Sequence, residues 1–144
     1  MIIDKPSMIK ELLDKSHNIA VVGMSPNPER DSNKVGKYLM DKGYNVIPVN
    51  PAVQEIYGKK SYPSILDIPK DIKIDIIDVF RNPEASKEIV MQAPALKPKA
   101  VWLQLGAESP DVINTALSEN LDLVYGICIM VTHRNMSNEV GFSI

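Results

Sequence analysis

The sequence predicts an α/β fold, a Rossmann-like, doubly wound, mostly parallel sheet of about five strands with helices on both faces. Short apolar runs such as IAVV recur along the chain, as is typical of strands that are covered on both sides. Segments of about ten residues with apolar side chains at helical spacing alternate with these runs. Two of those segments begin with a capping residue followed by proline, which marks the start of a helix.

The amino-terminal half is expected to contain two helices and two strands. In chain order they are a helix over 6–15, a strand over 19–23, a helix from about Asn33 to Tyr44 and a strand over 45–51. Pro48 has no N–H to donate to a neighbouring strand, which places its strand at an edge of the sheet or leaves it partly paired.

The carboxyl-terminal half continues the alternation. The expected elements are a strand over 74–80, a helix over 81–93, a strand over 100–106, a helix over 109–120 and a strand over 122–126. Asn82 and Ser109 are the predicted caps of the two helices. Residues 52–69 are predicted as turns, with one brief strand or helical turn near Tyr62, and no strong period follows Ile127.

Length and composition narrow the class of protein. The 144 residues fit a single domain over 1–144, and the net charge of −2 gives no support to binding of nucleic acid or a membrane surface. A local cationic pocket for an anionic small molecule stays open. No apolar run reaches the roughly 18 residues of a membrane span. The single cysteine, Cys128, forms no internal disulfide and favours a cytoplasmic protein. Assembly into a homo-oligomer stays open.

The residues that directly follow the predicted strands are the candidate site. Ligands of doubly wound sheets bind outside the carboxyl ends of the strands, where the strand order reverses. The residues found there offer close approach, hydrogen bonds and a cation: Gly23-Met24-Ser25, Asn50-Pro51, Phe80-Arg81-Asn82 and Gln104-Leu105-Gly106. The helix start at about Asn33 adds free N–H groups, so the sequence predicts an anionic ligand. Arg81 has a second interpretation, as a cap or an ion-pair partner of Glu84 on the surface.

A nicotinamide dinucleotide is one candidate ligand. The loop GMSPNP has Gly23 and lacks the other two glycines of G-x-G-x-x-G, and the second strand ends in Asn50 where an acid would bind the ribose. Gly36 is expected to let the helix approach the sheet in place of the third glycine. The intervening loop is then longer and free to wrap a bulkier phosphate group, and Arg30 and Lys34 in it have the matching charge. An oxidoreductase using NAD(P), with Arg30 or Lys34 at a 2′-phosphate, remains an alternative.

Three segments in order carry a resemblance to a known family. VVGMSPNPERDSNKVGKYLMDKGYNVIPVNP, then DVFRNPE, then VWLQLG resemble the small stand-alone CoA-binding domains. These are similar to the CoA-binding portions of the succinyl-CoA synthetase alpha subunit and of NDP-forming acyl-CoA synthetases. The resemblance covers residues 9–136 and implies a protein that binds CoA or an acyl-CoA.

The resemblance also implies a set of contacts along the strand ends. They are Gly23, Met24, Ser25, Asn33, Lys34 and Val35 at the phosphates, Asn50 and Pro51 at the adenosine, Phe80 and Arg81 across the switch point, and Gln104 and Gly106 at the pantetheine arm. Lys59 or Lys60 is a further candidate for the 3′-phosphate.

The carboxyl-terminal motif of the family is only partly present. The family often has Asp-Arg-Cys followed by Glu-His, whereas this chain has Gly126-Ile127-Cys128 and then Thr132-His133. Without those charges, and without a nucleophile and base side by side, the sequence does not support an enzymatic activity. We expect Cys128 and Trp102 to be core residues. An interaction subunit that completes an acyl-CoA synthetase is the remaining alternative.

Overall fold

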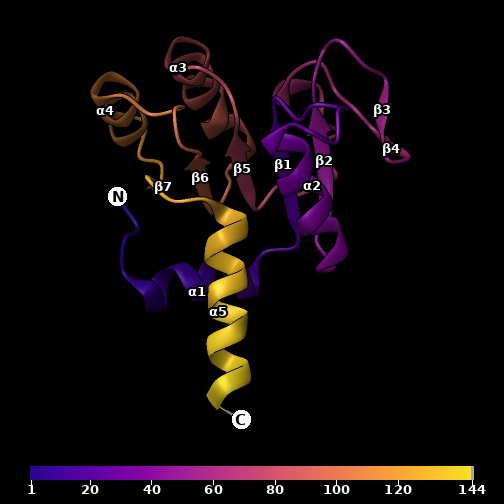
Figure 1. Ribbon diagram of the computed structural model, residues 1–144. Helices are drawn as coiled ribbons and strands as arrows, with labels where there is room; N and C mark the ends of the chain where they lie inside the picture. The colour runs from indigo at the N-terminus through magenta and orange to yellow at the C-terminus, as the bar shows by residue number, and fades with distance from the viewer. Residues whose placement is uncertain (144) are drawn as a thin grey trace.

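Five parallel strands form the sheet at the centre of the molecule (Figure 1). A computed structural model describes residues 1–143, with the side chains of residues 1–137. The strands are β1 (Asn18–Val22), β2 (Asn45–Val49), β5 (Ile76–Val79), β6 (Ala100–Leu103) and β7 (Leu123–Tyr125). Their spatial order is β2-β1-β5-β6-β7, and every neighbouring pair is parallel. The predicted Rossmann-like fold is confirmed.

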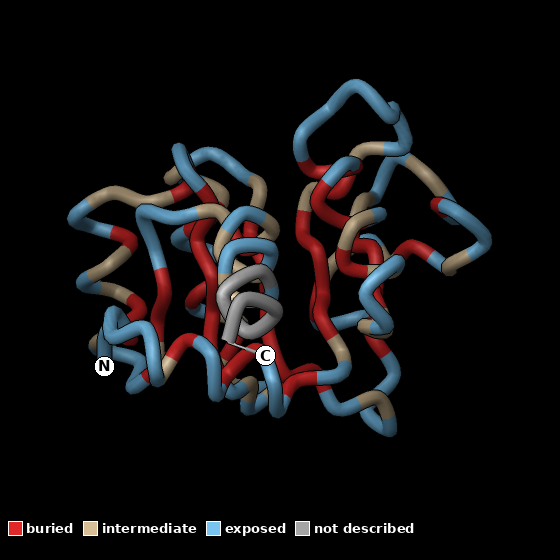
Figure 2. The backbone as a smooth tube through the Cα atoms, turned by 60° about the horizontal axis from the view of Figure 1, so that its bottom comes forward, coloured by how far each residue is buried: buried red, intermediate tan, exposed pale blue. Residues whose placement is uncertain are grey.

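Helices cover both faces of this sheet. One face carries α1 (Pro6–Lys15), α2 (Asp31–Asp41) and α5 (Ile129–Ser143), and the other carries α3 (Pro83–Gln92) and α4 (Pro110–Ser118). Successive strand side chains point to opposite faces. Val21 therefore packs with the first group of helices and Val22 with the second. Figure 2 shows the resulting buried strands between exposed outer segments.

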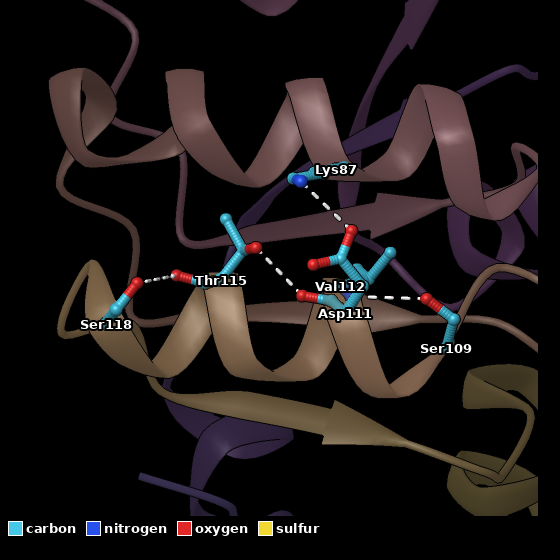
Figure 3. A network of polar contacts seen from close by, with 6 residues as sticks. All are labelled: Lys87, Ser109, Asp111, Val112, Thr115 and Ser118. Carbon is cyan, nitrogen blue, oxygen red and sulfur yellow. Dashed lines mark hydrogen bonds and ion pairs between the residues drawn. The ribbon is translucent and has the colours of Figure 1, made fainter.

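The second layer of helices begins at the two predicted caps. Asn82 Oδ1 accepts a hydrogen bond from Ala85 N at 2.8 Å, and Ser109 Oγ accepts one from Val112 N at 3.2 Å. An ion pair of 3.0 Å between Lys87 of α3 and Asp111 of α4 joins the two helices (Figure 3). Because both charged groups are largely exposed, this pair adds little stability. Both caps confirm the sequence prediction.

The β2 edge of the sheet carries a small hairpin. Pro48 pairs in register with Val21 of β1, and on its outer side Pro48 O accepts a hydrogen bond from Tyr62 N, so the predicted edge position is confirmed. The hairpin consists of β3 (Glu55–Ile56) and β4 (Lys59–Lys60). Its turn residues Tyr57 and Gly58 have φ values of 52° and 75°, the combination of a type I′ turn.

The stretch around that hairpin was predicted as turns, and the hairpin was missed. The expected helical turn is present as the short 3₁₀ helix η1 (Ile65–Asp67), and a second one, η2 (Ala93–Leu96), follows α3. The helix α5 was missed as well. Its apolar residues Ile129, Met130 and Val131 are consecutive and lie on different sides of the helix, and Val131 is 38% exposed, so the sequence shows no clear helical period. No helix in the described part of the chain has the length and apolar character needed to cross a membrane.

Candidate functional site

The chain changes direction between β1 and β5, at the centre of the sheet. The connection after β1 leads through α2 to β2 on one side, and the connection after β5 leads through α3 to β6 on the other. Doubly wound sheets bind their ligands at this switch point. A hydrogen bond of 2.8 Å from Phe80 N to Val22 O joins the carboxyl ends of β5 and β1, and one of 2.8 Å from Gly23 N to Val49 O joins the ends of β1 and β2.

Gly23 lies at the point where the loop after β1 crosses the end of β5. Its φ is +84°, and a Cβ at this position would lie 2.5 Å from Phe80 O and 2.9 Å from Arg81 Cδ. A side chain would therefore collide with backbone and also strain the dihedral angles. Gly23 thus allows the close approach that the sequence predicted. In this structure, the segment that approaches it is the end of the neighbouring strand β5.

The side chain of Met24 belongs to the core. Met24 is fully buried beneath α2, and a Cβ on Gly36 would lie 2.7 Å from Met24 Sδ. Gly36 does allow close helix packing, as the sequence predicted, but the group that it accommodates is this methionine. Val35 is also buried in the core. Neither Met24 nor Val35 therefore presents its side chain to a ligand.

The side chain of Asn33 braces the loop after β1. Helix α2 begins at Asp31, two residues before the expected start, so Asn33 lies within its first turn and is 1% exposed. Asn33 Nδ2 donates to Ser25 O at 2.8 Å, and Asn33 Oδ1 accepts from Tyr57 OH at 2.6 Å. Both ends of the amide are therefore used within the protein. The loop is also held by Ser25 N, which donates to Ser32 Oγ at 2.9 Å.

Asn50 plays the same part at the end of β2. Its Nδ2 donates to Met24 O at 2.9 Å, and its Oδ1 accepts from Ala52 N at 2.8 Å. The two asparagines hold opposite ends of the segment from Met24 to Ser25 by its carbonyl groups. The two asparagines thus fix the shape of the loop through its carbonyl groups, while the N–H of Ser25 is taken by Ser32 Oγ.

The start of α2 has no side-chain cap. Its N-cap residue is Arg30, whose guanidinium has donors only and cannot accept from the helix. The first N–H groups of a helix have no partner within the helix, and they attract anions. Arg30 and Lys34 are exposed beside this turn, together with the carboxylate of Asp31.

A cavity of about 200 Å³ opens on the α3 side of the switch point. Its lining combines polar and apolar surface: Arg81 and Glu88 are the charged residues at its wall, and the apolar members include Val22, Val49, Pro51, Pro63 and Ile65. The structure therefore brings Pro51 and Arg81 to one hollow, although the strands that they follow, β2 and β5, are separated in the chain by residues 50–75. Arg81 forms no ion pair among the described residues, so the alternative pairing with Glu84 is not made.

A buried polar pair lies between β5 and β6. Gln104, 3% exposed, donates from Nε2 to Asp78 Oδ1 at 2.5 Å. Asp78 is fully buried, and this burial raises the pKa of its carboxyl to about 7, against the lowering effect of the hydrogen bond. Sequence reasoning named Gln104 and missed Asp78. The signal was available, since one acid interrupts the apolar strand IIDVF.

The remaining candidate residues are spread more widely. Gly106 is exposed with φ +91°, and a Cβ there would meet nothing within 4 Å. Lys59 Nζ contacts Asn45 Oδ1 at the amino end of β2, away from the site, whereas Lys60 lies over the Tyr62 ring, 5.3 Å from its centroid. Trp102 is fully buried, so its prediction as a core residue is confirmed.

His133 and Cys128 lie on the α5 side of the molecule. His133 Nδ1 is 2.7 Å from Tyr38 OH, in the second half of α2, and burial lowers the pKa of the imidazole. Cys128 is half-buried against the core. Within the described residues, no group of three or more His, Cys, Asp or Glu side chains is placed to hold a metal ion.

The strand order, the two helical layers and the switch point define a Rossmann-like α/β domain. Residues 17–134 match the family described as CoA binding domain, and the chain belongs to this family. The resemblance noted from the sequence is thereby confirmed.

Similar proteins include both small proteins and large ligases. The uncharacterized protein YneT of Bacillus subtilis is 35% identical over 125 residues, 87% of this chain and 91% of YneT. The solved structure of a hypothetical protein from Pyrococcus horikoshii is 41% identical, with a TM-score of 0.87 and 92% of each chain covered. An ADP-forming acetate–CoA ligase of Archaeoglobus fulgidus is 39% identical over 61 residues, 42% of this chain and 9% of the ligase. The match to the ligase thus involves a small part of that enzyme.

Proposed function

We propose that residues 1–144 form a single module that binds CoA or an acyl-CoA across the carboxyl ends of β1, β2 and β5. The observation that carries this proposal is the cavity lined by Pro51 and Arg81 at the switch point, in a chain of the CoA binding domain family whose helix α2 starts without a side-chain cap. A partly apolar hollow and a set of free N–H groups together suit a ligand with a purine at one end and phosphates beside it.

The phosphates are assigned to the backbone. Gly23 N and Ser25 N already donate within the protein, to Val49 O and Ser32 Oγ. Met24 is fully buried, and Asn33 N donates to Arg30 O. The donors assigned to the anion are therefore the N–H groups of Asp31 and Ser32 at the start of α2. Arg30 and Lys34 add positive charge at the same turn, which offsets the negative charge of the ligand.

The adenine is assigned to the cavity on the α3 side, against Pro51 and the apolar ends of β1 and β2. Arg81, on its wall, supplies a guanidinium for a phosphate or for stacking on the ring. Phe80, half-buried next to Arg81, packs against the core on the α2 side of the sheet and does not line this cavity. The pantetheine arm then runs toward Gln104 and Gly106 at the end of β6.

We further propose a non-catalytic, accessory role. His133 is hydrogen-bonded to Tyr38 far along α2, and the acid, arginine and glutamate of the family motif are replaced in this chain. Neither Cys128 nor His133 is therefore paired with a group that would activate it at the strand ends.

Thermal unfolding with matched ligands tests the proposal. CoA, NAD and NADP are added at the same concentration, and the melting temperature is compared with that of the free protein. We expect CoA to raise it, since a ligand at 100 times its Kd adds about 2.7 kcal/mol. Stabilisation by NADP without any by CoA would reverse the choice in favour of an oxidoreductase.

The similarity to acetate–CoA ligases favours one second candidate, an interaction subunit that completes an acyl-CoA synthetase. Co-purification with a ligase-type chain would support this candidate. A stable homo-oligomer purified with CoA bound would count against it.

A further inference from the structure

We propose that Asp78 is a positioning residue of the candidate site. Through its hydrogen bond with Gln104, it orients the Gln104 carboxamide so that the oxygen faces the ligand, and the group recognised there is an amide N–H of the pantetheine arm. This inference rests on the proposed function and adds to it a residue and a chemical preference for the arm.

Asp78 lies directly beneath the switch point. In the sheet it pairs in register with Val21 of β1 and Trp102 of β6, and its neighbours on the same face are apolar core residues. Gln104 is the first residue after β6, and its backbone N donates to Val79 O at 3.1 Å. The side chain of Gln104 is thereby held beside β5, with Asp78 within reach.

The chemistry of the two groups decides the orientation. Above its pKa of about 7 the Asp78 carboxyl is ionised and only accepts hydrogen bonds, whereas a carboxamide has a donor end and an acceptor end; the orientation holds for the ionised form. Because Nε2 of Gln104 is 2.5 Å from Asp78 Oδ1, Oε1 is turned away from Asp78. The buried side-chain atoms without a partner among the described residues are Asp78 Oδ2 and Glu108 Oε2, and Gln104 Oε1 is not one of them. The acceptor end of Gln104 is thus the end that remains available at the rim.

The burial of Asp78 is difficult to explain by stability. Placing a carboxyl group in an apolar core is costly, and one of its two oxygens has no partner. Its neighbours in register, Val21 and Trp102, would pack equally well against an apolar side chain. The burial of Asp78 destabilises the fold, and its hydrogen-bond partner Gln104 is a residue of the candidate site. We therefore explain the burial by the orientation that Asp78 imposes on the Gln104 carboxamide.

The ligand that matches an exposed acceptor is one that offers a donor. The pantetheine arm of CoA carries two secondary amides, and each has one N–H. A carboxamide free to turn over would present its NH₂ group as readily as its oxygen. Asp78 removes this freedom, so the arm meets an acceptor without any cost of reorienting Gln104.

Two ligands separate the arm from the nucleotide in a binding experiment. CoA has the arm, and adenosine 3′,5′-bisphosphate has much of the nucleotide without it. Titration calorimetry measures both affinities for the wild-type chain, Asp78→Leu, Gln104→Met and the double variant, each checked for folding by its melting temperature. We expect both single variants to weaken CoA binding roughly three- to tenfold, the range for one hydrogen bond, and to leave the bisphosphate unchanged.

The double variant tests whether Asp78 acts through Gln104. If it does, the double variant binds CoA as weakly as either single variant, because the second change removes nothing further. Equal weakening of both ligands, or an Asp78→Leu protein with unchanged CoA affinity, would overturn the inference while leaving the proposed function standing. A wild-type chain that binds neither ligand would overturn both.

Asp78→Asn serves if the leucine variant does not fold. Asparagine keeps the shape of aspartate but offers a donor as well as an acceptor, so Gln104 regains its freedom to turn over. We expect the ratio of CoA affinity to bisphosphate affinity to fall in this variant also. An unchanged ratio in a folded Asp78→Asn protein contradicts the positioning role.

Discussion

The helices that start at the carboxyl rim of the sheet begin in two different ways. On one face, α3 and α4 each start with a side-chain cap and a proline, so Asn82 and Ser109 use up N–H groups of the first turn. On the other face, α2 starts at Arg30 with no side-chain cap. The polar side chains near α2, Asn33 and Asn50, instead hold carbonyl groups of the preceding loop. At the starts of α3 and α4 the protein itself therefore satisfies N–H groups of the first turn, whereas the start of α2 lacks a side-chain acceptor and is open to an anion.

Gly23→Ala is expected to have the largest effect, because it disturbs the loop on which the open rim depends. The new Cβ would lie 2.5 Å from Phe80 O at a φ of +84°. We expect a loss of more than about 2 kcal/mol in the free energy of unfolding, measured by urea denaturation, together with loss of CoA binding. Gly126→Ala is the matched control, with φ +83° and nothing within 4 Å of the added Cβ. It should cost only about 1 kcal/mol, and equal losses would show that the contact with β5 is unimportant.

Arg81→Ala tests the charged residue at the wall of the cavity at the switch point. If the guanidinium meets a phosphate, calorimetry should show CoA binding weakened by about 1.5 to 3 kcal/mol, the range for hydrogen bonds to charged groups. Lys87→Ala, which breaks the exposed ion pair with Asp111 on the capped side, is the control and should leave the affinity unchanged. Unchanged affinity in both variants returns Arg81 to the role of a surface residue.

The free energy of unfolding is expected to depend on pH through Asp78, the buried acid of β5 at the switch point. The native Asp78 carboxyl has a pKa of about 7, against an ordinary value of 3.8. Between these pH values the native state holds one proton more than the unfolded chain. The contribution of Asp78 to the free energy of unfolding therefore falls as pH rises, by at most about 1.4 kcal/mol per pH unit, and becomes constant above about pH 7.

Asp78→Asn removes this contribution. Urea denaturation at several pH values between about 4 and 8 should show the variant gaining stability relative to the wild-type protein as pH rises. Comparing the two proteins at each pH cancels the other titrating groups. Parallel curves for the two proteins would mean that Asp78 does not titrate as its burial requires.

Adding a side-chain cap to α2 and removing one from α4 is expected to change the free energy of unfolding least. The pair of variants tests directly whether the uncapped start of α2 binds the ligand. Arg30→Ser adds a side-chain cap to α2, and Ser109→Ala removes one from α4. We expect the first to raise the free energy of unfolding by about 0.5 to 1 kcal/mol while weakening CoA binding, and the second to lower it by about 1 kcal/mol with CoA binding intact. To separate the lost cation from the new cap, Arg30→Ala is measured alongside. Equal CoA affinity in Arg30→Ser and Arg30→Ala would contradict a role for the open helix start.

Local patterns were sufficient for most of the fold. Apolar runs marked all five strands, Asn82 and Ser109 with their prolines marked two helix starts, and Pro48 marked the edge strand. The hairpin at Tyr57 and the helix α5 were not predicted. The hairpin strands are only two residues long, and α5 lacks an apolar period, so neither element leaves a strong local signal.

The candidate site was predictable in position and less so in the role of each residue. Strand ends can be read from the sequence, and the carboxyl ends of parallel strands share one edge. Whether an amide such as that of Asn33 is free or used depends on Tyr57, 24 residues away in the chain. Gln104 meets Asp78 across a separation of 26 residues. Such partners are set by the register of strands and loops, which no short stretch of sequence specifies.

The sequence by itself determined the alternation of strands and helices, the glycine turn after the first strand and the membership of the chain in its family. These features follow from local periodicity, backbone freedom and motifs that lie within short segments. Only the tertiary structure decided that Met24 is a core residue, that Asn33 and Asn50 are braces and that Asp78 lies buried against Gln104. The physical reason is that burial and hydrogen-bond partners arise when distant segments pack together, and the same polar residue can serve the protein or a ligand.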